Sequence, residues 1–222
     1  MYRFLFAIIL FPIYLLSQTN SVNDSSGSKV AIKNNTQPHV VVTSVDLTFN
    51  DRRIIALING SQQVDYKLIG ESVISTKEFG NMGLVITNKN ILGVSNNSTE
   101  FARQPLYGDS NINYTIANSL IFVITNRKIY IYTISSSEWR VIDITGETIR
   151  AHAAFDKTGT IITNKRLIAY SETLKDVQFF SIDSFIPIYS FHVLENKIVY
   201  DSANKTIIYR PETGEFSIIK MN

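Results

Sequence analysis

The chain repeats one short motif at a fixed interval, and this repeat restricts its fold more than any other feature. VITN occupies residues 85–88 and 123–126, and IITN occupies residues 161–164, so Asn88, Asn126 and Asn164 are 38 residues apart. A step of 38 back from Asn88 reaches Asn50, and a step of 40 forward from Asn164 reaches Asn204. A fixed period of about 20–50 residues is typical of solenoids and propellers.

Two further landmarks follow the same period. The glycine motifs LIGES, LYGDS and ITGET begin at residues 68, 106 and 144, while the fourth copy, IDSFI at 182–186, lacks the glycine. An acidic residue precedes an aromatic one at Glu100-Phe101, Glu138-Trp139 and Glu215-Phe216. Three landmarks in one register predict an internal repeat of about 38 residues.

Each repeat contains four short stretches rich in residues that favour strands. In the third repeat they are INYTIAN, SLIFVITN, KIYIYTI and EWRVIDI, and several are apolar throughout, as expected of sheets covered on both faces. Four strands in about 40 residues are typical of a propeller blade. The sequence therefore predicts an all-β fold: a single β-propeller with five blades of four antiparallel strands, over residues 29–222.

The segments FVITN…VIDITGE and YRPETGEFSII resemble the YVTN-type and quinoprotein-type repeats of bacterial β-propellers. The resemblance covers the whole repeat region but rests on loose motifs, and the hairpin after the asparagine is shorter than in the YVTN pattern. It implies the propeller fold. No position matches the quinone-binding residues of that family, so no cofactor is expected.

The first residues indicate export. Arg3 precedes an apolar run from Phe4 to Leu16, which is typical of a signal peptide and short for a membrane-spanning helix. We expect residues 1–17 to be a signal peptide, with a retained short anchor as the alternative, and residues 18–28 to be a flexible polar leader. The chain has no cysteine, which excludes a lipoprotein anchor and favours a bacterial protein that is periplasmic, on the cell surface or secreted, with no transmembrane segment after cleavage.

The repeated turns have structural explanations. Asparagine tolerates left-handed backbone angles and can bond its own backbone, so the VITN asparagine is expected to serve a tight hairpin between the second and third strands. The glycine of the second landmark is expected at a sharp turn with positive φ between blades. The acid and hydroxyl residue after it could bond neighbouring backbone N–H groups.

Basic residues lie in the hairpins between the second and third strands of the blades. These hairpins all emerge on one face of a propeller. Such a ring could hold an anionic partner; alternatively, Glu71, Asp109, Glu147 and Asp183 of the inter-blade loops simply pair with these bases. The candidate basic face comprises Arg52, Arg53, Lys89, Arg127, Lys128, Lys165, Arg166 and Lys205.

Histidine recurs at one place in the repeat. His152 and His192 each lie 12 residues before their anchor, and Tyr114 takes the same place in the third repeat. On the innermost strands these three side chains could approach a central channel. Ordinary packing is the alternative, and the absence of an equivalent carboxylate or third histidine speaks against a metal site.

The predicted function is a non-catalytic binding or scaffold module, with a protein as the expected partner. The innermost strands are poor in carboxylates, and no nucleophile elbow, phosphate loop or zinc-protease motif is present. The net charge of +2 gives no reason to expect nucleic acid. Two alternatives stay open: a lectin-like binder of acidic glycans or another anionic ligand, and a small propeller hydrolase or lyase.

Overall fold

The computed structural model describes residues 44–136, 138–182 and 188–220, in which every regular element is a β-strand. All these strands belong to one compact unit. The predicted signal peptide and leader lie outside the described residues, as does Asp183. Within the described ranges, no helix is long and apolar enough to cross a membrane.

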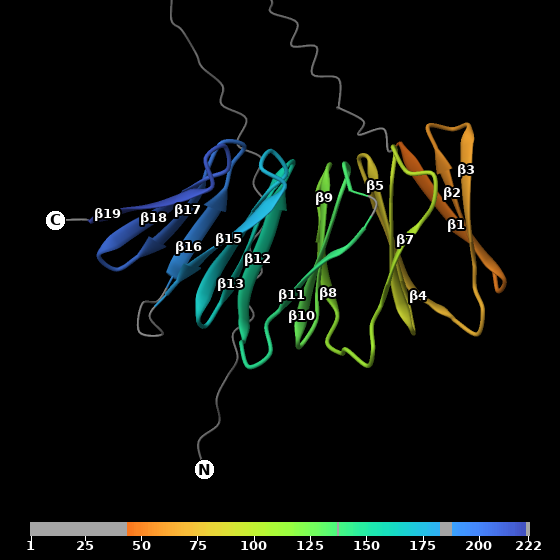
Figure 1. Cartoon of the computed structure of the whole chain (residues 1–222), viewed down its shortest axis with the longest axis horizontal. Helices are drawn as coiled ribbons and strands as arrows, with labels where there is room; N and C mark the ends of the chain where they lie inside the picture. Colours follow the sequence, from red (N-terminus) through yellow and green to blue (C-terminus); the bar gives the residue numbers. More distant parts are fainter. Residues whose placement is uncertain (1–43, 137, 183–187, 221–222) are drawn as a thin grey trace, which may run out of the picture. The chain divides into compact units, whose positions relative to one another are not determined.

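The strands form five successive antiparallel sheets, which are the blades of a β-propeller (Figure 1). The first blade contains β1 (Val45–Phe49), β2 (Arg53–Ile58) and β3 (Gln62–Lys67). The second contains β4 (Val73–Phe79), β5 (Met82–Thr87), β6 (Asn90–Ser95) and β7 (Ala102–Pro105). The third contains β8 (Asn113–Ile116), β9 (Leu120–Ile124), β10 (Lys128–Thr133) and β11 (Arg140–Asp143).

The fourth blade contains β12 (Ile149–Phe155), β13 (Thr158–Thr163), β14 (Arg166–Ser171) and β15 (Asp176–Ser181). The fifth contains β16 (Ile188–Val193), β17 (Ile198–Ser202), β18 (Lys205–Arg210) and β19 (Glu215–Lys220). In these blades the strands pair in sequence order. The predicted all-β propeller fold is confirmed, with four strands in four blades and three described strands in the first.

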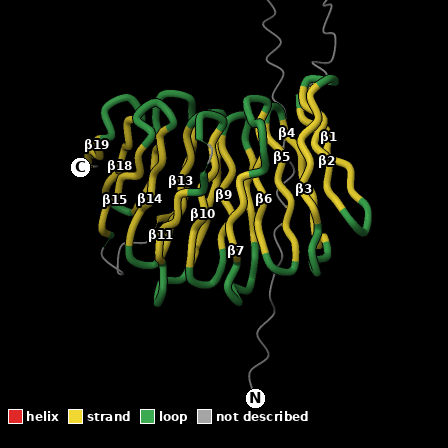
Figure 2. The backbone as a smooth tube through the Cα atoms, turned by 45° about the vertical axis from the view of Figure 1, so that its right-hand side comes forward, coloured by secondary structure: helices red, strands yellow, loops and turns green. Residues whose placement is uncertain are grey.

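Within the described unit, the blades follow one another in sequence order, with the first and last at opposite ends (Figures 1 and 2). Neighbouring blades meet through their opening strands: β8 lies against β12, and β12 against β16. We call β4, β8, β12 and β16 the first strands. The three described connections between blades run from a last strand to the next first strand along the lower edge of Figure 1, which we call the crossover end.

The central strands are buried on both faces because each middle blade packs between two others. Every residue of β5, β6, β9 and β13 is buried. Between the third and fourth blades, Phe122 and Ile131 pack with Ile161, Ile168 and Tyr170 in one core cluster. Continuous apolar strands thus mark blades with a neighbour on each side, as the sequence predicted.

The two end blades instead alternate between an apolar and a polar face. In the last blade, Asp201 and Thr206 occupy the positions that Ile162 and Leu167 hold in the fourth blade, and the Thr206 hydroxyl donates to the Asp201 carboxylate at 3.0 Å. In the first blade, Arg53 lies 3.8 Å from Asp65 on the outward face. Each outward face therefore carries polar groups that can be solvated, as in the capping repeats of repeat proteins.

Candidate functional site

The asparagine of the repeated motif joins each central hairpin to the crossover loop beside it. The side-chain oxygens of Asn88, Asn126 and Asn164 accept hydrogen bonds from the backbone N–H groups of Ser72, Ser110 and Thr148, at 3.0, 3.0 and 2.9 Å. None of the three asparagines has a positive φ. Each asparagine lies in the hairpin between the second and third strands, as predicted, but the expected left-handed backbone angle is wrong: the side chain instead bridges to the crossover loop.

The threonine before the asparagine closes the hairpin itself. Thr163 accepts hydrogen bonds from the backbone N–H groups of Lys165 and Arg166 at 3.0 and 2.9 Å. Asn50 plays the same part in the first blade, and Ser202 takes this place in the last blade, where its hydroxyl donates to the Lys205 carbonyl oxygen. The 38-residue period aligned Asn50 and Asn204 with Asn88, Asn126 and Asn164. In the structure each of these two residues lies one position away from the equivalent site.

The glycine turns were predicted correctly, whereas the acids after them have other partners than expected. Gly70, Gly108 and Gly146 have φ values of 62°, 77° and 76°. The carboxylates that follow accept hydrogen bonds from side chains rather than from backbone N–H groups. Glu71, for example, accepts from Thr87 and Asn90, each at 2.7 Å.

Asp109 is the most enclosed of these acids. It accepts a hydrogen bond from the Tyr130 hydroxyl and lies 2.5 Å from the Arg127 guanidinium. Burial opposes its ionisation, but the hydrogen bonds from Tyr130 and Arg127 outweigh that effect and hold the pKa of Asp109 below its usual value. This carboxylate is ionised and is held by Tyr130 and Arg127, which suits a structural role.

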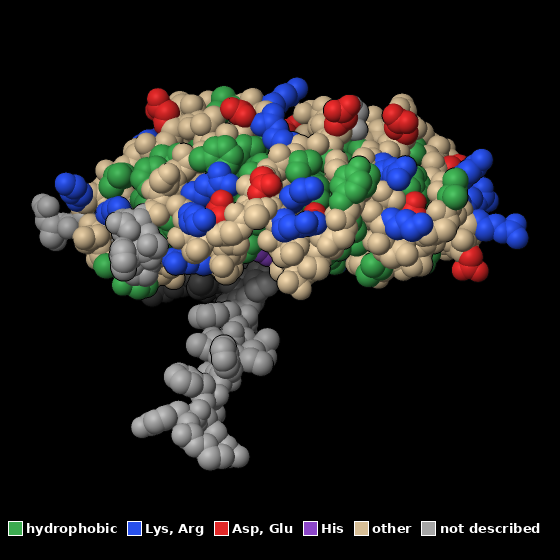
Figure 3. Space-filling model, turned by 60° about the horizontal axis from the view of Figure 1, so that its bottom comes forward, with side chains coloured by type: hydrophobic (Ala, Val, Ile, Leu, Met, Phe, Trp, Pro, Cys, Tyr) green, Lys and Arg blue, Asp and Glu red, His purple; other side chains and the backbone are tan. Residues whose placement is uncertain are grey.

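The structure places the eight predicted basic residues at the crossover end, where Figure 3 shows Lys and Arg side chains with acids between them. Two of them pair with loop acids: Arg127 with Asp109, and Arg166 with Glu147 at 2.7 Å. Arg53 pairs with Asp65 within its own blade. Among the described residues the other five have no ion pair: Arg52, Lys89, Lys128, Lys165 and Lys205.

Large apolar side chains accompany these cations, and the sequence reasoning missed them. Among the described residues, the four most exposed large hydrophobic side chains all lie at the crossover end: Ile69 (78%), Tyr107 (74%), Tyr189 (68%) and Ile74 (64%). Ile69 and Tyr107 directly precede the turn glycines, a position that could have been recognised as a loop tip. Ile74 and Tyr189 sit at β-bulges of β4 and β16, which turn a side chain out of the ladder.

Tyr107 has a backbone conformation that is rare for a bulky side chain. Its φ is 46°, in the left-handed region, and its carbonyl oxygen accepts a hydrogen bond from Arg127 at 3.1 Å. Lys128 lies 5.8 Å from the centre of the Tyr107 ring. An exposed aromatic residue held in an unfavourable backbone region is a candidate functional position.

The three channel candidates do not come together. Tyr114 packs against the core between the second and third blades, and His192 is exposed on the last blade. Only His152 lines a cleft, where its Nδ1 lies 2.5 Å from the Thr115 hydroxyl. Burial lowers the pKa of His152, which favours the neutral imidazole.

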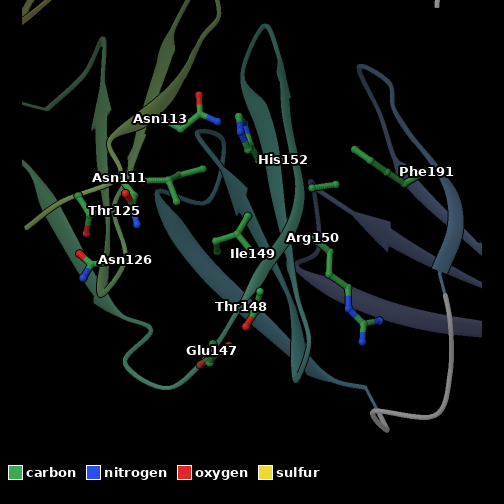
Figure 4. A pocket seen from close by; sticks show the side chains of 12 residues that line it. Asn111, Asn113, Thr125, Asn126, Glu147, Thr148, Ile149, Arg150, His152 and Phe191 are labelled. Atoms are coloured by element: carbon green, nitrogen blue, oxygen red, sulfur yellow. The ribbon is translucent and has the colours of Figure 1, made fainter. Parts of the chain in front are cut away.

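This cleft, of about 730 Å³, runs along β8 and β12 and reaches β16 (Figure 4). Asn113 and His152 point toward each other across it, and Phe191 approaches from β16. Arg150, which the sequence reasoning did not single out, lies at the β-bulge of β12. In the described part of the chain, no group of three or more His, Cys, Asp or Glu residues could hold a metal ion.

Comparisons with known proteins add little to this description. No protein-family model and no curated protein matches the chain. Among solved structures, human WBSCR16 is similar over 75% of this chain and 59% of its own, with 8% identity and a TM-score of 0.40. A HIRA fragment is similar over 80% of this chain and 53% of its own, with 8% identity and a TM-score of 0.42.

The chain therefore spans less than two thirds of either solved chain. The assignment of propeller blades rests on the strand order and register of this chain, not on those matches. The resemblance to YVTN-type repeats stays a prediction.

Proposed function

We propose that this chain is an exported, non-catalytic propeller module that binds a protein through its crossover end. The observation that carries the proposal is the concentration of the four most exposed large apolar side chains there, beside cations that have no ion pair among the described residues. Exposed apolar residues within a polar rim are characteristic of protein interfaces.

The chemistry of this surface suggests the partner's chemistry. Tyrosine is enriched in interface hot spots, and Tyr107 and Tyr189 offer two exposed rings. Arg52, Lys89 and Lys165 are exposed around the hairpins and would attract acidic groups. The proposed partner is thus an acidic protein segment with apolar anchors.

The rest of the proposal relies on the sequence. Export follows from the predicted signal peptide, and the final compartment would be the periplasm, the cell surface or the medium. The absence of catalysis is proposed because the loop acids Glu71, Asp109 and Glu147 are each committed to side-chain partners. A carboxylate with such partners is poorly placed to exchange protons with a substrate.

The test compares two triple variants in affinity capture from envelope extracts of the source cells. Ile69→Ser, Tyr107→Asn and Tyr189→Ser together remove the three most exposed of the four apolar groups of the crossover end, and Asn suits the left-handed backbone at position 107. The matched control carries Phe155→Ser, Leu174→Ser and Leu194→Ser, which are exposed apolar residues at the opposite end of the blades.

We expect the first variant to lose at least about tenfold in captured partner, since hot-spot truncations cost about 2 kcal/mol or more. The control variant should capture the partner like the unmodified protein. A partner retained equally by both variants would refute the proposal. Circular dichroism and thermal melting would verify that both variants are folded.

A further inference from the structure

The cleft beside β12 shares no lining residue with the exposed apolar side chains of the crossover end. Its accessible groups suit a small molecule. Asn126 uses its oxygen to accept from Ser110, and Asn113 uses its oxygen to accept from Tyr114. The N–H donors of both side-chain amides have no hydrogen bond within the described residues and lie at the cleft. Thr148 adds a hydroxyl group to the same wall. These groups would otherwise bond water, and a ligand rich in hydroxyl groups could replace it.

Histidine adds another polar group to this wall. One nitrogen of His152 is used by Thr115, so the ring presents its other nitrogen as either donor or acceptor, depending on the tautomer. The Asn113 side chain faces it from the opposite side of the cleft (Figure 4). A hydroxyl group can accept from the Asn113 N–H group and either donate to the free histidine nitrogen or accept from it, so it suits this pair in either tautomer.

Arg150 gives the cleft a positive charge. The ladder between β12 and β13 shifts register between Ile149 and Ala151, and this bulge leaves the Arg150 side chain exposed. The other charged residue in the lining, Glu147, is paired with Arg166 at 2.7 Å and is thereby neutralised. A guanidinium group binds carboxylates through two parallel hydrogen bonds, so a ligand carboxylate fits this position.

Apolar groups complete the site. Phe191 from β16 and Ile149 of β12 line the cleft with the polar groups. A volume of about 730 Å³ lies within the range of small-molecule sites and has room for one or two sugar rings. We propose that this cleft binds an acidic saccharide, with Arg150 holding the carboxylate, the amides and His152 contacting hydroxyl groups, and Phe191 covering the apolar face of a sugar ring.

Calorimetric titration of the full chain with galacturonate, and separately with a galacturonic acid trimer, tests this assignment. Glucose lacks the carboxylate and acetate lacks the ring, so both should bind more weakly than galacturonate. Arg150→Met should weaken galacturonate binding about tenfold or more, as expected for the loss of a charge-assisted contact. The matched control Arg210→Met removes an exposed arginine outside this cleft and should leave binding unchanged.

Binding of the trimer alone would support the site and identify a polysaccharide as the source of the ligand. Equal binding by the Arg150→Met and Arg210→Met variants would overturn the proposal, as would the absence of saturable binding by both uronate probes. Phe191→Ala provides a second variant for the assignment and should also lower the affinity. Thermal melting of each variant would separate a lost contact from a lost fold.

Discussion

At the scale of single residues, the repeated asparagine contributes by joining two segments that are 16 positions apart. Its side-chain oxygen accepts one backbone hydrogen bond from the crossover loop, in three successive blades. Each of these bonds holds the crossover loop against a hairpin of the blade into which that loop leads. The motif therefore repeats in these three blades because their crossover loops are held in the same way.

Replacing Asn164 tests this bridge against Asn204 of the last blade, whose side chain makes no such bond to any described residue. Asn164→Ala removes the acceptor for the Thr148 N–H group and should lower the free energy of unfolding by about 1 kcal/mol. Asn204→Ala should change it by less than about 0.5 kcal/mol, because that residue is exposed and one position out of register. Urea unfolding measures both values, and equal losses would contradict the corrected register.

The sequence predicted the repeat well because turns and strands depend on local chemistry. Glycine with positive φ and apolar strands were recognisable from residue type alone. The bridging role of Asn126 was not, because it depends on which loop lies beside the hairpin in three dimensions. The bulges that expose Ile74, Arg150 and Tyr189 were missed for the same reason, since a bulge is a property of the pairing between two strands.

At the scale of elements, blades pack closely enough that one strand requires a residue without a side chain. A Cβ atom added at Gly159 of β13 would lie 2.3 Å from the Phe122 ring of the preceding blade. Gly159 is therefore needed for contact between blades and not for its backbone angle. Protein interiors have little free volume to absorb such an overlap.

Gly159→Ala should destabilise the fold by about 1–3 kcal/mol, because the Phe122 ring has to move. In a Phe122→Leu background the same substitution should cost less, since the smaller side chain leaves room for the methyl group. A double-mutant cycle from urea unfolding measures this coupling. Additive losses would show that the two residues do not clash.

At the scale of the whole described unit, the end blades differ from the middle ones in the face that has no neighbour. Isoleucine occupies position 86, 124 or 162 in the three middle blades, and Asp201 takes this place in the last blade. Thr206 likewise replaces a large apolar residue. These polar residues allow water to solvate the outward face of the last blade, on which no further described blade packs.

Making this face apolar should change association rather than folding. Asp201→Ile with Thr206→Leu would join Val199 and Ile208 into one apolar face, and we expect the variant to self-associate at concentrations where the unmodified chain does not. Sedimentation velocity over a concentration series measures this. As a control, Glu212→Leu adds an exposed apolar residue in the last hairpin, outside this face, and should not cause self-association. A loss of stability without association would instead indicate that the face is packed against another part of the chain.

The polar end faces also determine how such a chain can change in length during evolution. A copied middle blade brings two apolar faces, so it can be inserted only between blades that already present apolar faces to each other. A blade added after the last one would meet Asp201 and Thr206 and would leave their polar groups buried. Duplication of a unit of about 38 residues is therefore tolerated in the interior of the array and disfavoured at its end.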